Sequence, residues 1–406
     1  MYYNRYTLSN GLRIIHQSNT SKVTYCGFAI NAGTRDEEEK ESGLAHFVEH
    51  LIFKGTQKRK AWHILNRMEN VGGDLNAFTN KEETLIYSSF LNAHFDRAVE
   101  LLVDIVFHST FPQQEIDKEV DVVLDEIQSY KDTPSDLIYD DFENLFYAKH
   151  PLGRYILGNP QTLAKVQSLD AKRYTSNYYQ PENMVFFVLG GIDFKKVIAV
   201  LRKYFEEIPN ASVRLNRQPP VHYVAQQVVK EKETNQAHVM LGAPSYPLFS
   251  PKRVGLALLN NVLGGPGMNS RLNLELRERK GYVYNVESNV MTFTDSGIFS
   301  IYFGTDFKNR DKCLSLTLKE LRKMREVRMT PLQLTRAKNQ LMGQLGVAED
   351  NNESRALGMG RTFLHLDEYK SLSQIYEEIE ALQPEYLLEI ANEVFAEDQL
   401  SILCYE

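Results

Sequence analysis

The sequence predicts an α+β protein built from two domains. Short segments rich in β-branched and aromatic residues follow one another through brief turns, which favours antiparallel pairing. Between these segments apolar residues recur at helical spacing, so helices are expected to pack on one face of each antiparallel-rich sheet. A chain of 406 residues exceeds what one hydrophobic core usually holds, and 43% hydrophobic residues can fill two.

Each expected element rests on its local pattern. Strands are expected at residues 5–17, 23–33, 83–91 and 183–192, and in the second half at 238–246, 282–290, 297–305 and 400–406. Helices are expected near residues 43–55, 60–71, 94–107, 113–130, 193–206, 251–264 and 331–347.

A polar stretch without sustained periodicity separates the two halves. It contains the adjacent prolines Pro219 and Pro220, which are typical of a linker. The predicted organisation is an N-terminal domain at 1–210, a linker at 211–222 and a C-terminal domain at 223–406.

The two halves also resemble each other weakly. The segment GLAHFVEHL, which begins at Gly43, can be aligned with GLALLNNVL, which begins at Gly255. The alignment predicts an internal duplication. Residues that could bind a metal in the first segment face Leu258, Asn261 and Val262 in the second, so only the first half is expected to hold a metal.

The run His46-Phe47-Val48-Glu49-His50 is the most informative motif of the chain. On a helix, His46 and His50 are four residues apart and Glu49 is three from His46, so all three side chains leave the same face. The order His-x-x-Glu-His is the inverse of the common zinc protease motif. It predicts a zinc-dependent hydrolase site.

Catalytic zinc usually takes a third protein ligand and keeps one open position. The best source is the predicted helix at 113–130, where Glu119 and Glu126 stand seven residues apart on one face. A solvated helix face would show the same acidic residues. The residues alone therefore leave the third ligand open.

With these glutamates the chain resembles the pitrilysin, insulysin and mitochondrial processing peptidase family of inverted-motif zinc peptidases, in its short bacterial-type form. The resemblance rests on the His-x-x-Glu-His motif and on the positions of both glutamates. It implies that His46, His50 and Glu126 bind one Zn²⁺ per chain. It also implies that Glu49 is the general base and that Glu119 supports the metal site without binding the ion.

Two further segments carry the same resemblance. The stretch GGDLNAFTNKEETLIY, taken alone a turn and one strand, resembles the family's edge strand. There the backbone of an extended peptide would pair with Asn76, Ala77, Phe78 and Thr79. The stretch LRERKGYVYNVES resembles the segment whose arginine and tyrosine reach the substrate, here Arg277 and Tyr284; taken alone they are a surface charge and a strand aromatic.

The resemblance implies a zinc metalloendopeptidase whose two similar domains form a clamshell around the zinc. A homodimer is expected, with a heterodimer with a paralogue as the alternative. Two rival functions remain: a non-catalytic or partner-dependent subunit of the same family, and a structural zinc protein. The second would close its metal site with a fourth protein ligand, and no residue stands at a suitable spacing.

Composition excludes several other classes. A net charge of -7 and a pI near 5.9 argue against a nucleic-acid partner. The three scattered cysteines predict no disulfide framework and a reducing compartment. Neither a signal peptide nor a membrane span is evident. A cytoplasmic location is therefore expected, with a periplasmic one only if a signal peptide has been removed.

Overall fold

The computed structural model describes residues 3–221 and 223–406, so residue 222, one end of the predicted linker, lies outside the described residues. Two compact units make up the chain. Unit 1 comprises Met1–Gln128, Arg154–Arg217 and Ala348–Tyr369, and unit 2 comprises Ser129–Gly153, Gln218–Val347 and Lys370–Glu406. These units are not contiguous like the predicted domains 1–210 and 223–406, because each half of the chain contributes one segment to the unit of the other half.

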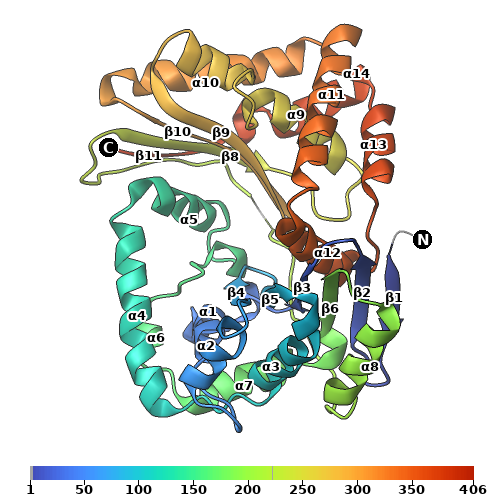
Figure 1. Cartoon of the computed structure of the whole chain (residues 1–406). Coiled ribbons are helices and arrows are strands. Elements are labelled where there is room, and N and C mark those ends of the chain that lie inside the picture. The colour runs from blue at the N-terminus through green and yellow to red at the C-terminus, as the bar shows by residue number, and fades with distance from the viewer. Residues whose placement is uncertain (1–2, 222) are drawn as a thin grey trace. The chain divides into compact units, whose positions relative to one another are not determined.

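Unit 1 is built on a six-stranded sheet (Figure 1). The strand order is β1-β2-β6-β3-β5-β4, in which β2 and β6 are parallel and all other neighbours are antiparallel. The strands are β1 (Asn4–Thr7), β2 (Arg13–Ser18), β3 (Val23–Ile30), β4 (Asp74–Thr79), β5 (Thr84–Leu91) and β6 (Met184–Gly190).

Unit 2 has a five-stranded sheet with the order β7-β11-β8-β10-β9. Its strands are β7 (Gln227–Lys230), β8 (Ala237–Pro244), β9 (Val283–Thr292), β10 (Gly297–Thr305) and β11 (Ser401–Tyr405). Here β7 and β11 are parallel and the other pairs are antiparallel. The same sequence of strand directions runs from β2 to β4 in unit 1, which supports the predicted duplication.

The helices fall into the same two units. Unit 1 contains α1 (Leu44–Leu51), α2 (Ala61–Glu69), α3 (Phe95–Phe107), most of α4 (Gln113–Lys131), α6 (Pro160–Leu163), α7 (Ser168–Tyr178), α8 (Phe194–Phe205) and α12 (Asn352–Leu366). Unit 2 contains α5 (Pro134–Phe146), α9 (Arg253–Gly264), α10 (Arg310–Glu326), nearly all of α11 (Pro331–Ala348), α13 (Leu372–Ala381) and α14 (Pro384–Val394). Within residues 3–221 and 223–406, none of the helices has the length and apolar character needed to cross a membrane.

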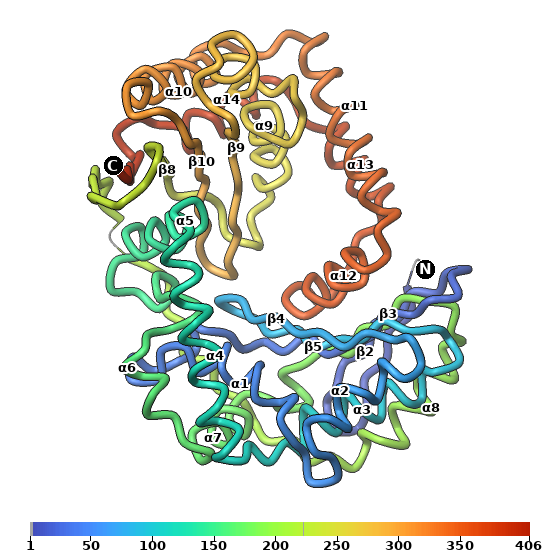
Figure 2. The backbone as a smooth tube through the Cα atoms, turned by 60° about the vertical axis from the view of Figure 1, so that its left-hand side comes forward, coloured from blue at the N-terminus to red at the C-terminus, as the bar shows by residue number. Residues whose placement is uncertain are grey.

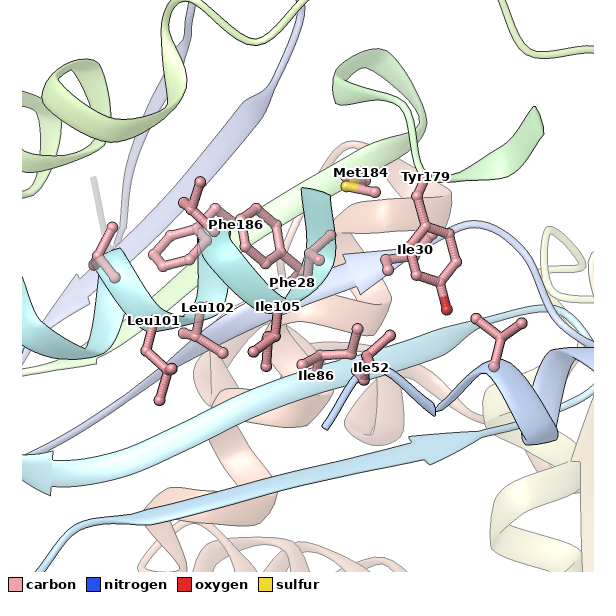
Figure 3. Close-up of a cluster of buried hydrophobic side chains, with 14 of the residues drawn as sticks. Phe28, Ile30, Ile52, Ile86, Leu101, Leu102, Ile105, Tyr179, Met184 and Phe186 are labelled. Carbon is pink, nitrogen blue, oxygen red and sulfur yellow. The ribbon is translucent and has the colours of Figure 1, made fainter. Parts of the chain in front are cut away.

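The main core of unit 1 lies between its sheet and α1, α3 and α8. Alternate residues of the strands point into it, among them Phe28, Ile86 and Phe186, and they meet Leu102 and Ile105 of α3 (Figure 3). This alternation is the expected result of successive strand side chains leaving opposite faces. The antiparallel-rich sheet with packed helices confirms the predicted α+β class.

The expectation of helices on one face is incomplete, because each sheet is also covered on its second face. In unit 1 the intervening strand residues, such as Leu85 and Phe187, pack against Met359 and Phe363 of α12, which lies on the side opposite α3 (Figure 2). In unit 2 the corresponding cover is α5. A sheet that is apolar on both faces needs a second layer. Both covering helices lie in the segments that each unit receives from the other half of the chain.

Close packing and the hydrogen-bond partners of a buried carboxylate fix α12 to its sheet. A Cβ atom added at Gly360 would lie 2.5 Å from a ring carbon of Phe187, so only glycine lets the helix approach this closely. The carboxylate of Glu83 accepts hydrogen bonds from Arg361 and, at 2.8 Å, from His365. These bonds outweigh burial and lower the pKa of Glu83 to about 2. The helix is therefore held as an integral layer of unit 1.

Candidate metal centre

Helix α1, which carries the His-x-x-Glu-His motif, is anchored at its N-terminus. The carboxylate of Glu37 accepts the backbone N–H groups of Gly43 and Ala45 at 3.0 and 2.7 Å, which satisfies donors that a helix start leaves free. Gly43 has φ +92, and a Cβ atom there would lie 2.8 Å from Gly158. The start of α1 thus has one well-defined position on the core.

The structure brings His46, His50 and Glu126 together. Oε2 of Glu126, on α4, lies 3.8 Å from Nε2 of His46 and 3.8 Å from Nε2 of His50. One potential ligand atom from each residue lies within 4.8 Å of the other two. Among the described residues this is the only group of three or more such side chains that could hold a metal ion.

The hydrogen bonds of His50 set which ring nitrogen is available. Its Nδ1 lies 2.9 Å from Oε1 of Glu119, and the other oxygen of Glu119 lies 2.6 Å from Nζ of Lys54. Burial alone would raise the pKa of Glu119, but the bonds from His50 and Lys54 outweigh it and hold this pKa below its ordinary value. The carboxylate is thus an acceptor, and when Nδ1 of His50 donates to it, Nε2 can serve as a ligand.

The electrostatics of the cluster suit a divalent cation. Burial, with a smaller contribution from His50, lowers the pKa of His46 to about 4, so this imidazole is neutral at pH 7, as a ligand must be. Burial also disfavours the charged form of His50, but the bond to Glu119 and the charges of Glu49, Glu119 and Glu126 outweigh it and raise its pKa. Two imidazoles and a carboxylate form the donor set expected for zinc, so the residues present fit this ion.

Glu49 lies beside this group but is not part of it. It is buried, and its Oε2 accepts a hydrogen bond from Oγ1 of Thr79 at 2.8 Å. Burial raises the pKa of Glu49, and Glu126 adds to this, although the bond from Thr79 works against it. The structure therefore places a carboxylate with a raised pKa on the same helix as both histidines.

The predicted edge strand is β4, the last strand in the order of the unit 1 sheet. It pairs with β5 on one side, with Asn76 opposite Tyr87, Ala77 opposite Ile86 and Phe78 opposite Leu85. Asn76 is exposed, and Thr79, at the end of the strand, is buried against Glu49. The end of the strand thus contacts the motif helix α1, while the role of the strand in peptide binding stays a prediction.

Arg277 and Tyr284 lie together in unit 2. Arg277 belongs to the π-helix η6 (Asn273–Glu278), and Tyr284 is near the start of β9. The guanidinium carbon lies 5.9 Å from the centre of the tyrosine ring, which is a cation–π distance. Tyr284 is 89% exposed, and π-helical turns are frequent at functional sites. The pairing is observed, and the role toward a substrate stays a prediction.

Two polar contacts of the site were missed by the sequence patterns. Lys54 follows His50 by four residues, so the spacing alone could have placed both near the same partner. Thr79 was predicted to act through its backbone, but its side-chain hydroxyl contacts Glu49. No pattern within a single segment marks that contact, because it joins a strand to a helix.

The fold and the site together define a class: proteins of two related α+β units in which one unit carries an inverted His-x-x-Glu-His motif beside an edge strand. The family model described as "Insulinase (Peptidase family M16)" matches residues 13–160. The model described as "Peptidase M16 inactive domain" matches residues 165–341. The chain belongs to peptidase family M16.

Relatives and solved structures agree with this membership. The chain is 35% identical over 396 residues to the uncharacterized zinc protease YmxG of Bacillus subtilis, with 97% of this chain and 96% of the relative covered. It is 30% identical over 399 residues to an uncharacterized zinc protease of Rickettsia felis, with 97% and 95% covered.

Two crystal structures share the fold. One, of a protease from Helicobacter pylori, has a TM-score of 0.91 at 24% identity and covers 100% of this chain and 99% of its own. The other, of a peptidase M16 inactive domain from Pseudomonas fluorescens, has a TM-score of 0.93 at 19% identity, with 100% and 98% covered.

Proposed function

We propose that this chain is a zinc metalloendopeptidase that hydrolyses peptide bonds in extended, unfolded peptides. The observation that carries the proposal is the group of His46, His50 and Glu126 beside Glu49, a buried carboxylate that stands outside the group. The relatives are named as zinc proteases, which supports the same chemistry.

His46, His50 and Glu126 are the side chains that would hold the zinc ion. When bound, zinc supplies Lewis acidity, which polarises a peptide carbonyl and makes water a stronger acid. Glu119 orients the imidazole of His50 through its Nδ1 and so keeps Nε2 directed toward Glu126. Three protein ligands leave a coordination position open for chemistry, as catalytic rather than structural zinc requires.

Glu49 is the general base in this proposal. Its raised pKa lies closer to neutral pH than that of an ordinary carboxylate. This suits a group that takes a proton from water and later donates it to the leaving amine. The bond from Thr79 fixes the orientation of the carboxylate through Oε2 and leaves Oε1 available to exchange the proton. Because Glu49 is not a ligand, the two steps need no change in the metal-binding set.

The edge strand β4 would bind the substrate by strand addition. A peptide that pairs with Asn76 to Thr79 gains backbone hydrogen bonds that do not depend on its sequence. It also passes the point where β4 contacts Glu49. In unit 2, Arg277 and Tyr284 would contact the substrate, with the guanidinium binding a peptide carbonyl or carboxylate.

We further propose that the chain works as a homodimer, and that it acts in the cytoplasm without a nucleic-acid or membrane partner. The free thiols of Cys26, Cys313 and Cys404, all buried, suit a reducing compartment. The oligomeric state can be measured by light scattering on the purified chain.

The test is to incubate the purified chain with a mixed peptide library, with and without a chelator, beside Glu49→Gln as a matched control. Cleavage that requires metal and is lost in the control supports the proposal. Zinc binding without cleavage would instead support the rival function, a subunit that depends on a partner. A chain that binds no zinc would contradict the proposal and favour a non-catalytic subunit.

A further inference from the structure

Lys54 is the outer member of a chain of contacts that ends at the metal group. Its Nζ lies 2.6 Å from Oε2 of Glu119, and Oε1 of the same carboxylate lies 2.9 Å from Nδ1 of His50. The side chain of Glu119 is 7% exposed and that of Lys54 is 28% exposed. Each oxygen of the Glu119 carboxylate therefore has its own partner, the ammonium of Lys54 or the ring nitrogen of His50. The carboxylate itself is largely shielded from water.

The two partners restrict the carboxylate in different ways. A carboxylate with a single hydrogen bond can turn about its last bond and exchange its oxygens, because both are equivalent acceptors. When Lys54 holds Oε2, Glu119 keeps Oε1 for His50. A buried carboxylate without its cation would also pay an uncompensated desolvation cost, which favours movement toward water and away from His50.

We propose that Lys54 is a positioning residue for zinc binding, which acts through Glu119 to fix the ring of His50. This inference rests on the proposed function, because it takes zinc as the ion bound by His50. Lys54 does not contact the metal group itself and is not a catalytic residue. Partners of metal ligands typically change metal affinity 10- to 100-fold, and the more distant Lys54 is expected to contribute about tenfold.

The sign of the effect separates this role from simple charge repulsion. Lys54 is a cation near a site for a divalent cation, so repulsion predicts that its removal tightens zinc binding. Positioning predicts the opposite, weaker binding. The partial exposure of Lys54 screens the repulsion, whereas the contact with Glu119 is short and largely buried. Weaker binding is therefore the expected result.

The experiment measures the zinc dissociation constant of the full chain by competition with a chelator of known affinity. Lys54→Met should weaken binding about tenfold, and Lys54→Arg, which keeps the charge and a donor, should restore most of the affinity. Lys118→Met is the matched control, since Lys118 lies next to Glu119 on α4 but is 69% exposed and pairs with Glu115. It removes the same charge and should leave the affinity unchanged.

A double-variant cycle tests the path through Glu119. In a Glu119→Gln background, Lys54→Met should cause no further loss of zinc affinity, because the carboxylate whose two oxygens pair with Lys54 and His50 is already gone. Equal or tighter binding by Lys54→Met in the parent chain, or a further loss in the Glu119→Gln background, would overturn the proposal. Lys54→Leu is the second variant if Lys54→Met does not fold; failure of both to fold would assign Lys54 to the fold and reject the positioning role.

Zinc affinity and peptide cleavage are measured separately on the same preparations. A parent chain that binds zinc but cleaves no peptide contradicts the proposed function and leaves the affinity comparison valid. A parent chain that binds and cleaves while Lys54→Met binds equally well contradicts only the inference about Lys54.

Discussion

Replacing Gly360 with alanine should destabilise unit 1, whereas the same change at Gly358 should not. Both glycines lie in α12, where alanine favours the helix by about 1 kcal/mol over glycine. At Gly358 an added Cβ atom meets nothing within 4 Å, so this gain acts alone. At Gly360 the Cβ atom would lie 2.5, 3.0 and 3.1 Å from three ring carbons of Phe187.

The environment of Phe187 sets the size of the difference. Its side chain is fully buried in β6, so the ring cannot move away without disturbing the sheet. Overpacking of this kind costs about 1–3 kcal/mol. Gly360→Ala should therefore be less stable than Gly358→Ala by about 1–3 kcal/mol, because the gain in helix propensity is common to both and cancels.

Urea denaturation of the zinc-free proteins, followed by far-ultraviolet circular dichroism, gives the comparison without a contribution from metal binding. Because a chain of two units need not unfold in one step, hydrogen exchange of the peptide that contains β6 should be measured as well. It should be faster in Gly360→Ala. A difference in stability below about 0.5 kcal/mol, the usual size for surface substitutions, would refute the packing argument, as would unchanged exchange in β6.

Four other outcomes are expected. Glu49→Gln should lower the rate of peptide cleavage on the order of 10²–10⁴-fold while zinc content stays at the parent level; activity close to that of the parent would remove Glu49 as the base. Glu126→Gln should lower zinc occupancy, measured by metal analysis, since it removes a ligand; full occupancy would point to another carboxylate. Arg277→Ala and Tyr284→Phe should lose cleavage but keep zinc, and added zinc should not rescue them; unchanged cleavage by both would make unit 2 a scaffold only. A flexible peptide should be cleaved faster than the same sequence held in a stably folded domain, and equal rates would rule out strand addition.

Local patterns in the sequence predicted the elements of the site well. The helix expected at 113–130 is observed as Gln113–Lys131, and the predicted common face of Glu119 and Glu126 is the face that meets His50. The spacing could not identify which glutamate completes the metal group, because a solvated helix face has the same pattern. That choice depended on the resemblance to a known family.

The two exchanged helices could not be predicted in this way. The run Met184–Gly190 is apolar and buried throughout, which is typical of a strand covered on both faces. This run could have indicated a second layer on the sheet. It could not indicate that the layer is α12, since the partner lies far along the chain and periodicity reports only on neighbouring residues.

The composition of the predicted linker at 211–222 did not indicate that one of its charged side chains is nearly buried. Its polar residues suggested an exposed connection, but the side chain of Arg217 is nearly buried and pairs with both oxygens of Asp36 at 2.8 and 2.7 Å. It also donates to Asn31 at 2.9 Å. A charged residue in a segment without periodicity resembles a solvated one until its distant partner is known.

Because α5 and α12 each come from the other half of the chain, the order of translation determines when the sheet of unit 1 can be covered. Once β6 has emerged, the sheet of unit 1 has all its strands but lacks one apolar cover. At about 5–20 residues per second, roughly 10–35 s pass before α12 follows. During that interval side chains such as Leu85 and Phe187, which α12 later covers, are presented to water, to chaperones and to neighbouring nascent chains. Neither half of the chain is an independent folding unit. The second half must be almost fully translated before α12 can cover the sheet built by the first half.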